Sequence, residues 1–244
     1  MFAPSEGEPS WGGTKGFCSL RLGFNYSKEM ATDTLDAPTV CRISSARPAS
    51  EIVEAARDAT DVPVVATGST GARALEPLLM VTSGGTTRFF ASCTAERAAD
   101  VVGRIDGTAP MEGADAVVEH GDDPDRLPAP DLDALGVGTR SVLGLCGWVR
   151  PTDAGDYEAS GGFAALDADR EDALDAARAV TGRGWGDAAA DEPLGDLWDA
   201  VADAAGEPAV VVNAHGAAAD RLLLESAPHL ALEGAVLAAH TVDA

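Results

Sequence analysis

The charge of this chain constrains its fold more than any other feature. Its 244 residues include 40 aspartates and glutamates against 17 lysines and arginines, which leaves a formal net charge of −23. So large a charge opposes a compact fold by self-repulsion, unless concentrated salt shortens the range of that repulsion. It also repels phosphate backbones and anionic lipid headgroups, so we predict no nucleic-acid partner and no binding to a membrane surface.

The scarcity of lysine helps to explain the acidic composition. Lys15 and Lys28 are the only lysines, and every basic residue after position 29 is arginine. With abundant alanine and aspartate and few aromatic residues, this composition predicts a halophilic, salt-adapted protein. A disordered acidic chain is the alternative, but a hydrophobic content of 45% is enough to build a core.

Cysteine spacing and hydropathy indicate the compartment. The four cysteines lie far apart and include no C-x-x-C pair, which excludes a disulfide framework and a zinc site. No apolar run approaches the roughly 20 residues of a membrane helix. We therefore expect a soluble, cytoplasmic protein with buried, reduced thiols and no membrane insertion.

Residues 1–29 differ from the rest of the chain. They hold both lysines and five of the twelve aromatic residues (four Trp, two Tyr and six Phe in all), with no helical or strand period. They also lack the basic end and apolar block of a signal peptide. We interpret them as a disordered leader or a mis-assigned start, with Met30 as the true first residue.

Residues 30–106 have the pattern of a small α/β layer. Gly84-Gly85 is a two-residue hairpin signal between two β-type segments. Helices are predicted from Pro48 to Thr60 and over a second segment with apolar residues spaced i, i+3, i+4 and i+7 (Ala98, Val101, Val102 and Ile105). Strands are predicted at residues 39–44, 62–67, 78–82 and 86–92. The order β-α-β-β-β-α predicts an α/β fold with a thioredoxin-like layer.

The remainder divides into a linker and a mainly helical part. Residues 107–140 are rich in proline, aspartate and glycine, and we predict an acidic interdomain linker there. In residues 141–244 a buried-type strand is predicted at 209–213. The last predicted helix is apolar on most sides, so it needs neighbouring segments to cover it. Apolar spacing predicts the helices at residues 152–159, 169–180, 194–205 and 228–241.

Several segments together resemble a known signature. In the C-terminal part they are, in order, residues 145–166 (LCGWVRPTDAGDYEASGGFAAL), 182–184 (GRG), 193–198 (PLGDLW), 211–214 (VVNA) and 228–234 (PHLALEG). They resemble the flavin domain in the NADH-binding subunit of complex I, and in the related diaphorase subunits of NAD-linked hydrogenases and formate dehydrogenases. Residues 67–78 (TGSTGARALEPL) resemble T-G-C-x-G-x-C-x-x-E-P-L, a motif of the thioredoxin-like ferredoxin domain in longer family members. The resemblance implies a thioredoxin-like domain followed by a partial flavin-binding α/β domain.

The resemblance also implies cofactors, and the chain departs from the family at both sites. A two-iron cluster needs four thiolates, but Ser69 and Arg73 stand at two of the cysteine positions. No cysteine pair follows the first strand either, so we predict that no iron–sulfur cluster binds.

In the flavin loop, Gly182, Arg183, Gly184 and Asn213 correspond to surviving contacts for FMN and NAD. However, Trp185 replaces a family glycine, and three acidic residues follow in a loop that receives an anion. His215 replaces a family acid, and it has no partner at a suggestive spacing. The resemblance therefore implies weak FMN and NAD binding.

Two functional interpretations follow. One is a component of an NADH dehydrogenase-type complex, in which the family passes a hydride from NADH to FMN and electrons to iron–sulfur clusters. The other is a non-catalytic scaffold or interaction protein that keeps the family's fold. In both, the expected partners are other subunits of a redox complex or the missing remainder of the flavin domain. The sequence leaves open whether the chain is a fragment, half of a split subunit or complete.

Salt adaptation predicts a salt-dependent stability. Because −23 charges repel one another, the melting temperature should rise between low salt and multimolar KCl. Circular dichroism melting curves at both extremes measure this. Equal melting temperatures would contradict salt adaptation.

Overall fold

The computed structural model describes most of the chain beyond the leader. The described residues are 39–105, 112–121, 125–180, 193–204, 206, 209–213 and 217–244. The predicted leader 1–29, the proposed start at Met30, and Gly182, Arg183, Gly184 and His215 lie outside them.

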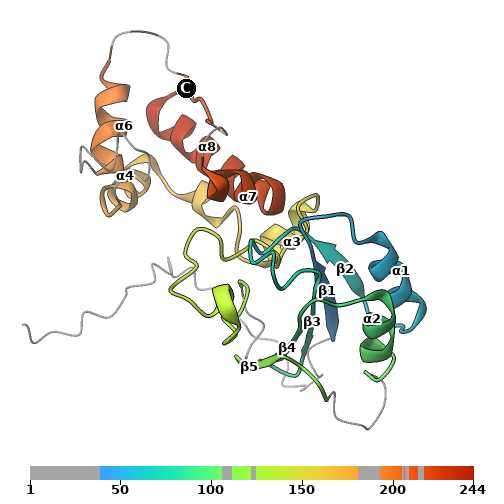
Figure 1. The fold of residues 1–244 in the computed structure, drawn as a ribbon. Coiled ribbons are helices and arrows are strands. Elements are labelled where there is room, and N and C mark those ends of the chain that lie inside the picture. The colour runs from blue at the N-terminus through green and yellow to red at the C-terminus, as the bar shows by residue number, and fades with distance from the viewer. Residues whose placement is uncertain are drawn as a thin grey trace, which may run out of the picture. The chain divides into compact units, whose positions relative to one another are not determined.

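A mixed five-stranded sheet organises the first half of the described chain (Figure 1). Its spatial order is β2-β1-β3-β4-β5, with β1 and β2 parallel and every other neighbouring pair antiparallel. The expected α/β fold is therefore confirmed at this level. The strands are β1 (Val40–Ser44), β2 (Val64–Thr67), β3 (Leu78–Ser83), β4 (Thr86–Phe90) and β5 (Ala116–Glu119).

The predicted Gly84-Gly85 hairpin joins β3 to β4. Ser83 pairs with Thr86, so the two glycines form the whole turn. Their φ angles are +56° and +73°. Two consecutive positive φ values are what a turn matched to the strand twist requires, and glycine adopts them without steric cost.

Two helices cover one face of the sheet. α1 (Ser50–Asp58) and α2 (Ala95–Val102) contact each other and lie on the same side (Figure 1). The Thr94 hydroxyl accepts a hydrogen bond from the Arg97 amide and so caps the start of α2. These helices bury the side chains that the strands direct toward them, including Cys41, Ile43, Leu79, Val81 and Phe90.

The opposite face is covered by the segment predicted as a linker and by the residues that follow it. Successive side chains of β3 point to opposite faces of the sheet. Leu79 and Val81 belong to the core under the two helices, whereas Leu78 and Met80 belong to this second core. Leu127 and Leu135 from the predicted linker lie in it with exposed fractions of 4% and 0%. Its other buried members are Ala72, Leu75, Phe89, Cys146, Trp148, Val149 and Ala227.

The predicted linker also contributes β5, which the sequence interpretation missed. Its four residues, AVVE, pair with β4 and are too few to show a period among acidic neighbours. The described residues 112–121 and 125–140 thus extend the sheet and help to cover its second face, together with the segment after them and with Ala72 and Leu75 from the loop between β2 and β3.

Arg42 ties the sheet to the segment after the predicted linker. Its guanidinium carbon lies 3.8 Å from the centroid of the Trp148 ring, and its Nε donates a hydrogen bond to the Trp148 carbonyl at 3.2 Å. Trp148 itself is 2% exposed. The cation–π contact and the hydrogen bond together fix the position of the Trp148 segment against β1.

The remaining described helices form the C-terminal part. The predicted helices correspond to α3 (Ala154–Ala159), α4 (Arg170–Arg178), α6 (Leu194–Ala202) and α8 (Pro228–Val242). A further helix, α7 (Ala218–Ser226), was not predicted. Two short 3₁₀ turns, at Asp133–Leu135 and Ala164–Asp167, complete the described elements.

The predicted strand at 209–213 is wrong for this structure. The segment forms no strand, and the exposed fractions of Val210, Val211 and Val212 are 38%, 86% and 52%. The run of valines favours a strand, but no described strand lies beside it to accept its hydrogen bonds.

No single described helix is long and apolar enough to cross a membrane, and α7 and α8 reach that length and hydropathy only when taken together across a bend of 101°.

A buried pair links α3 to α8. The Tyr157 hydroxyl donates a short hydrogen bond to Glu233, whose other oxygen accepts one from the Ala165 amide at 3.2 Å. Tyr157 is 1% exposed and Glu233 is 8% exposed. Burial, and then the hydrogen bond to Glu233 and its charge, raise the pKa of Tyr157 well above its ordinary value of 10.0.

We expect Tyr157→Phe to lower the free energy of unfolding by about 1–3 kcal/mol, because it leaves a buried carboxylate short of a donor. Since the pKa of Tyr157 is raised on folding, this contribution is complete below pH 10 and is lost as the pH rises beyond it. Denaturant unfolding at pH 8 measures the effect.

The matched control combines Tyr157→Phe with Glu233→Gln. Without its charge, residue 233 no longer leaves a buried carboxylate short of a donor. The loss of unfolding free energy in the double variant should therefore be smaller than the sum of the losses in the two single variants. Additive losses would show that the two groups are not coupled.

Candidate functional site

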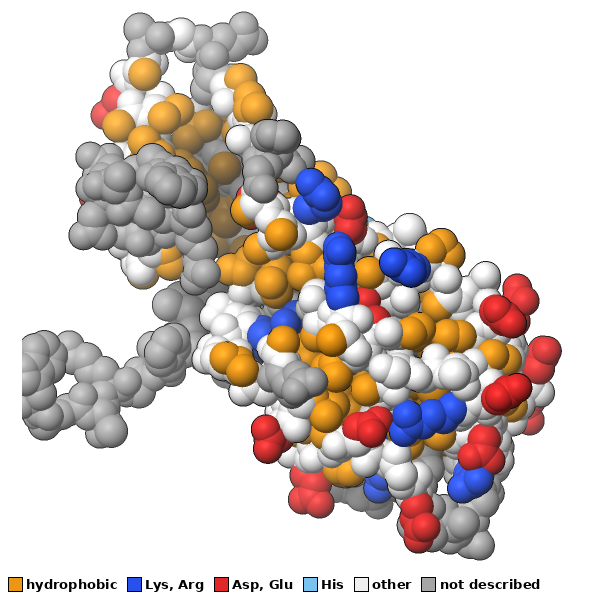
Figure 2. All heavy atoms as spheres, in the orientation of Figure 1, with side chains coloured by type: hydrophobic (Ala, Val, Ile, Leu, Met, Phe, Trp, Pro, Cys, Tyr) orange, Lys and Arg blue, Asp and Glu red, His pale blue; other side chains and the backbone are white. Residues whose placement is uncertain are grey.

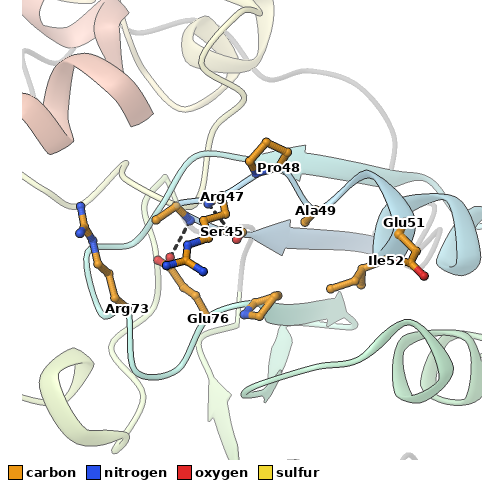
Figure 3. Close-up of a pocket in the computed structure, with 10 residues that line it drawn as sticks. Ser45, Arg47, Pro48, Ala49, Glu51, Ile52, Arg73 and Glu76 are labelled. Atoms are coloured by element: carbon orange, nitrogen blue, oxygen red, sulfur yellow. Dashed lines mark hydrogen bonds between the residues drawn. The ribbon is translucent and has the colours of Figure 1, made fainter.

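A cleft of about 610 Å³ lies at the carboxyl end of β1 (Figure 3). One wall is the loop from Ser45 to Ala49 with the first turn of α1. Arg73, Glu76 and Pro77, from the loop between β2 and β3, form the other wall. In open α/β sheets, ligands bind outside the carboxyl ends of the strands, so this cleft is the candidate functional site.

Glu76 holds the two walls together. Its Oε2 accepts a hydrogen bond from the Ala46 amide at 2.7 Å (Figure 3). Its Oε1 accepts bonds from the Ser69 hydroxyl at 2.6 Å and from the Thr70 amide and hydroxyl at 2.9 and 3.1 Å. These four hydrogen bonds to one carboxylate hold the two loops at a fixed separation and so define the shape of the cleft.

The residues at the two implied cysteine positions do not fit an iron–sulfur cluster. Ser69 is 6% exposed, and its hydroxyl is already engaged with Glu76 and with the Gly71 amide. Arg73 carries a guanidinium, which is not an iron ligand. Across the described ranges, no group of three or more His, Cys, Asp or Glu side chains is arranged to hold a metal ion.

The described cysteines lie away from the cleft. Cys41 and Cys93 belong to the core under α1 and α2, whereas Cys146 belongs to the core on the opposite face. Burial raises the pKa of the Cys41 thiol to about 12 and that of the Cys146 thiol to about 11. These groups therefore stay protonated near neutral pH, and their role is packing.

Segments distant in sequence meet at the loop after β2. The Thr67 hydroxyl donates a hydrogen bond to the Gly147 carbonyl at 2.9 Å. Gly68 packs so closely on α7 that a Cβ there would lie 2.5 Å from Ser226 Cα. The structure thus brings together two of the motif segments, residues 67–78 and 145–166.

The predicted flavin contacts are mostly outside the described part of the chain. Gly182, Arg183 and Gly184 all lie outside it. Asn213 is exposed in a segment without regular secondary structure. FMN and NAD binding at these residues therefore stays a prediction, and we derive no chemical step through either group.

Sequence reasoning missed the residues that shape and charge the cleft. Glu76 belongs to a motif segment, and a carboxylate beside a proline at the start of a strand was the available signal. Arg47 has no motif around it. It lines the same cleft as Arg73 because β1 pairs with both β2 and β3.

We expect Glu76→Gln to lower the free energy of unfolding by about 1.5–3 kcal/mol, because it weakens several charge-assisted hydrogen bonds at once. Glu51→Gln is the matched control, since Glu51 lines the same cleft and is exposed. It should change stability by less than about 0.5 kcal/mol. Chemical denaturation in high salt compares them, and equal effects would show that Glu76 is not the anchor.

No family model matches this chain, and no curated protein is significantly similar to it. The family resemblance therefore rests on the motif segments alone.

Proposed function

We propose that this chain is a component of an NADH dehydrogenase-type redox complex and acts there as a non-catalytic scaffold. The motif segments support relationship to the NADH-binding flavoprotein subunit. The observation that carries the non-catalytic role is at the cleft. Ser69 donates to Glu76 and Arg73 carries a positive charge, where the family places two thiolate ligands.

The strand connectivity supports a thioredoxin-like layer. A parallel pair, β1 and β2, is linked by one helix and continues into an antiparallel hairpin, followed by a second helix on the same face. This is the order that the sequence predicts for the ferredoxin-like domain. A relative that keeps this layer without the ligands retains a surface for neighbouring subunits.

The second candidate is a flavoprotein component with weak FMN and NAD binding. The resemblance of residues 182–184 to the family's glycine loop favours it, as does that of residues 211–214, which include Asn213. Any residual NADH oxidation would then need partner residues to complete the site.

Exposed apolar side chains on the C-terminal helices support a subunit role. Leu232 and Val236 on α8 are 57% and 53% exposed, and Leu197 and Val201 on α6 are 41% and 42% exposed. Figure 2 shows hydrophobic side chains on the visible surface of this part. Other subunits, or the remainder of a flavin domain, are the proposed partners in a cytoplasmic, salt-rich setting.

The decisive experiment is cofactor analysis of protein purified anaerobically in high salt. We expect no stoichiometric iron or acid-labile sulfide, no visible absorbance of bound flavin after added FMN is removed, and no NADH oxidation by the chain alone. Iron and sulfide at one cluster per chain would overturn the non-catalytic proposal. Bound FMN with NADH-dependent bleaching would favour the second candidate.

A further inference from the structure

We propose that the cleft beside β1 binds a carboxylate, held between Arg47 and Arg73. The cleft has a volume of about 610 Å³, and the two arginines that line it come from different loops, Arg47 from the loop after β1 and Arg73 from the loop after β2 (Figure 3). The inference rests on the described geometry and holds whether or not the chain belongs to a redox complex.

Neither arginine of the cleft is held in an ion pair by the described part of the chain. Six other arginines form ion pairs with described carboxylates. Arg47 and Arg73 form none with any described residue, although the chain carries 40 acidic residues. Both are exposed, so their guanidinium groups are available to a ligand.

Glu76, an acidic residue that lines the cleft, already binds donors of the protein itself. Glu76 accepts four hydrogen bonds from Ala46, Ser69 and Thr70. Its carboxylate forms no ion pair with either arginine among the described residues, because its oxygens bind the donors of the two loops. The first turn of α1 also lines the cleft, and its Ala49 N-cap provides no side-chain acceptor for the amides there.

The remaining lining selects the kind of anion. Glu51 places one carboxylate at the cleft, which disfavours a densely charged group such as phosphate. Pro48, Ile52 and Pro77 add apolar surface. A carboxylate on a short aliphatic body fits both conditions, and arginine binds it in a bidentate manner. It has two sources: a free aliphatic acid, or an acidic side chain of a partner protein.

The test titrates the full ¹⁵N-labelled chain with succinate while KCl is withdrawn to hold the ionic strength constant. We expect saturable shifts of the amide signals of Ala46, Arg47 and Arg73. Arg47→Gln and Arg73→Gln should each weaken binding about tenfold. Arg221→Gln is the matched control, because Arg221 is an exposed arginine on α7 without a described ion pair. It should bind succinate like the unaltered chain.

Titrations with two further ligands identify the class of the natural ligand. A blocked Asp-Glu peptide that binds more tightly than succinate assigns the carboxylate to a partner protein, and the reverse order assigns it to a free acid. Inorganic phosphate that binds more tightly than both would overturn the carboxylate assignment. Absence of saturable shifts at the cleft, or equal binding by the Arg47→Gln/Arg73→Gln double variant, would overturn the site itself.

Discussion

Burial of the sheet on both faces is the constraint on which the rest of this structure depends. Leu78, Leu79, Met80 and Val81 are each 0% exposed, so β3 directs apolar side chains into two separate cores. α1 and α2 cover only one of them. The second must be covered by the chain that follows, and Arg42 holds that chain in place through the ring and carbonyl of Trp148. Each fully buried side chain of this size contributes about 1.5–3 kcal/mol, which is large beside the net stability of a domain.

Covering the second face also builds the candidate site. The hydrogen bond from Thr67 to Gly147 joins the loop after β2 to the covering segment, and Glu76 then ties the same loop to the start of α1. The contacts that pack chain against both faces of the sheet therefore also position the two loops that line the cleft. Because Ser69 serves this framework as a hydrogen-bond donor to Glu76, the position is structural here.

The large negative charge has little part in holding the fold together. The described ion pairs involve half-exposed or exposed side chains, such as Arg178 with Asp175 and Asp196, and pairs of this kind contribute about 0–1 kcal/mol each. Acidic side chains are dispersed over the surface visible in Figure 2. Their effect is collective repulsion, which salt screens, whereas the two apolar cores supply the cohesion.

The sequence by itself determined the elements whose signals are local. The alternation and the glycine pair around the β3–β4 hairpin, and the apolar spacing of α2, α4 and α6, depend only on residues within one segment. Tertiary structure decided the others. β5 is too short to show a period and exists because β4 offers an edge, whereas the valines at 210–212 have strand propensity but no described strand to pair with. The presence of Arg47 and Arg73 in one cleft was likewise invisible in the sequence, because it arises from strand pairing between segments that share no local pattern.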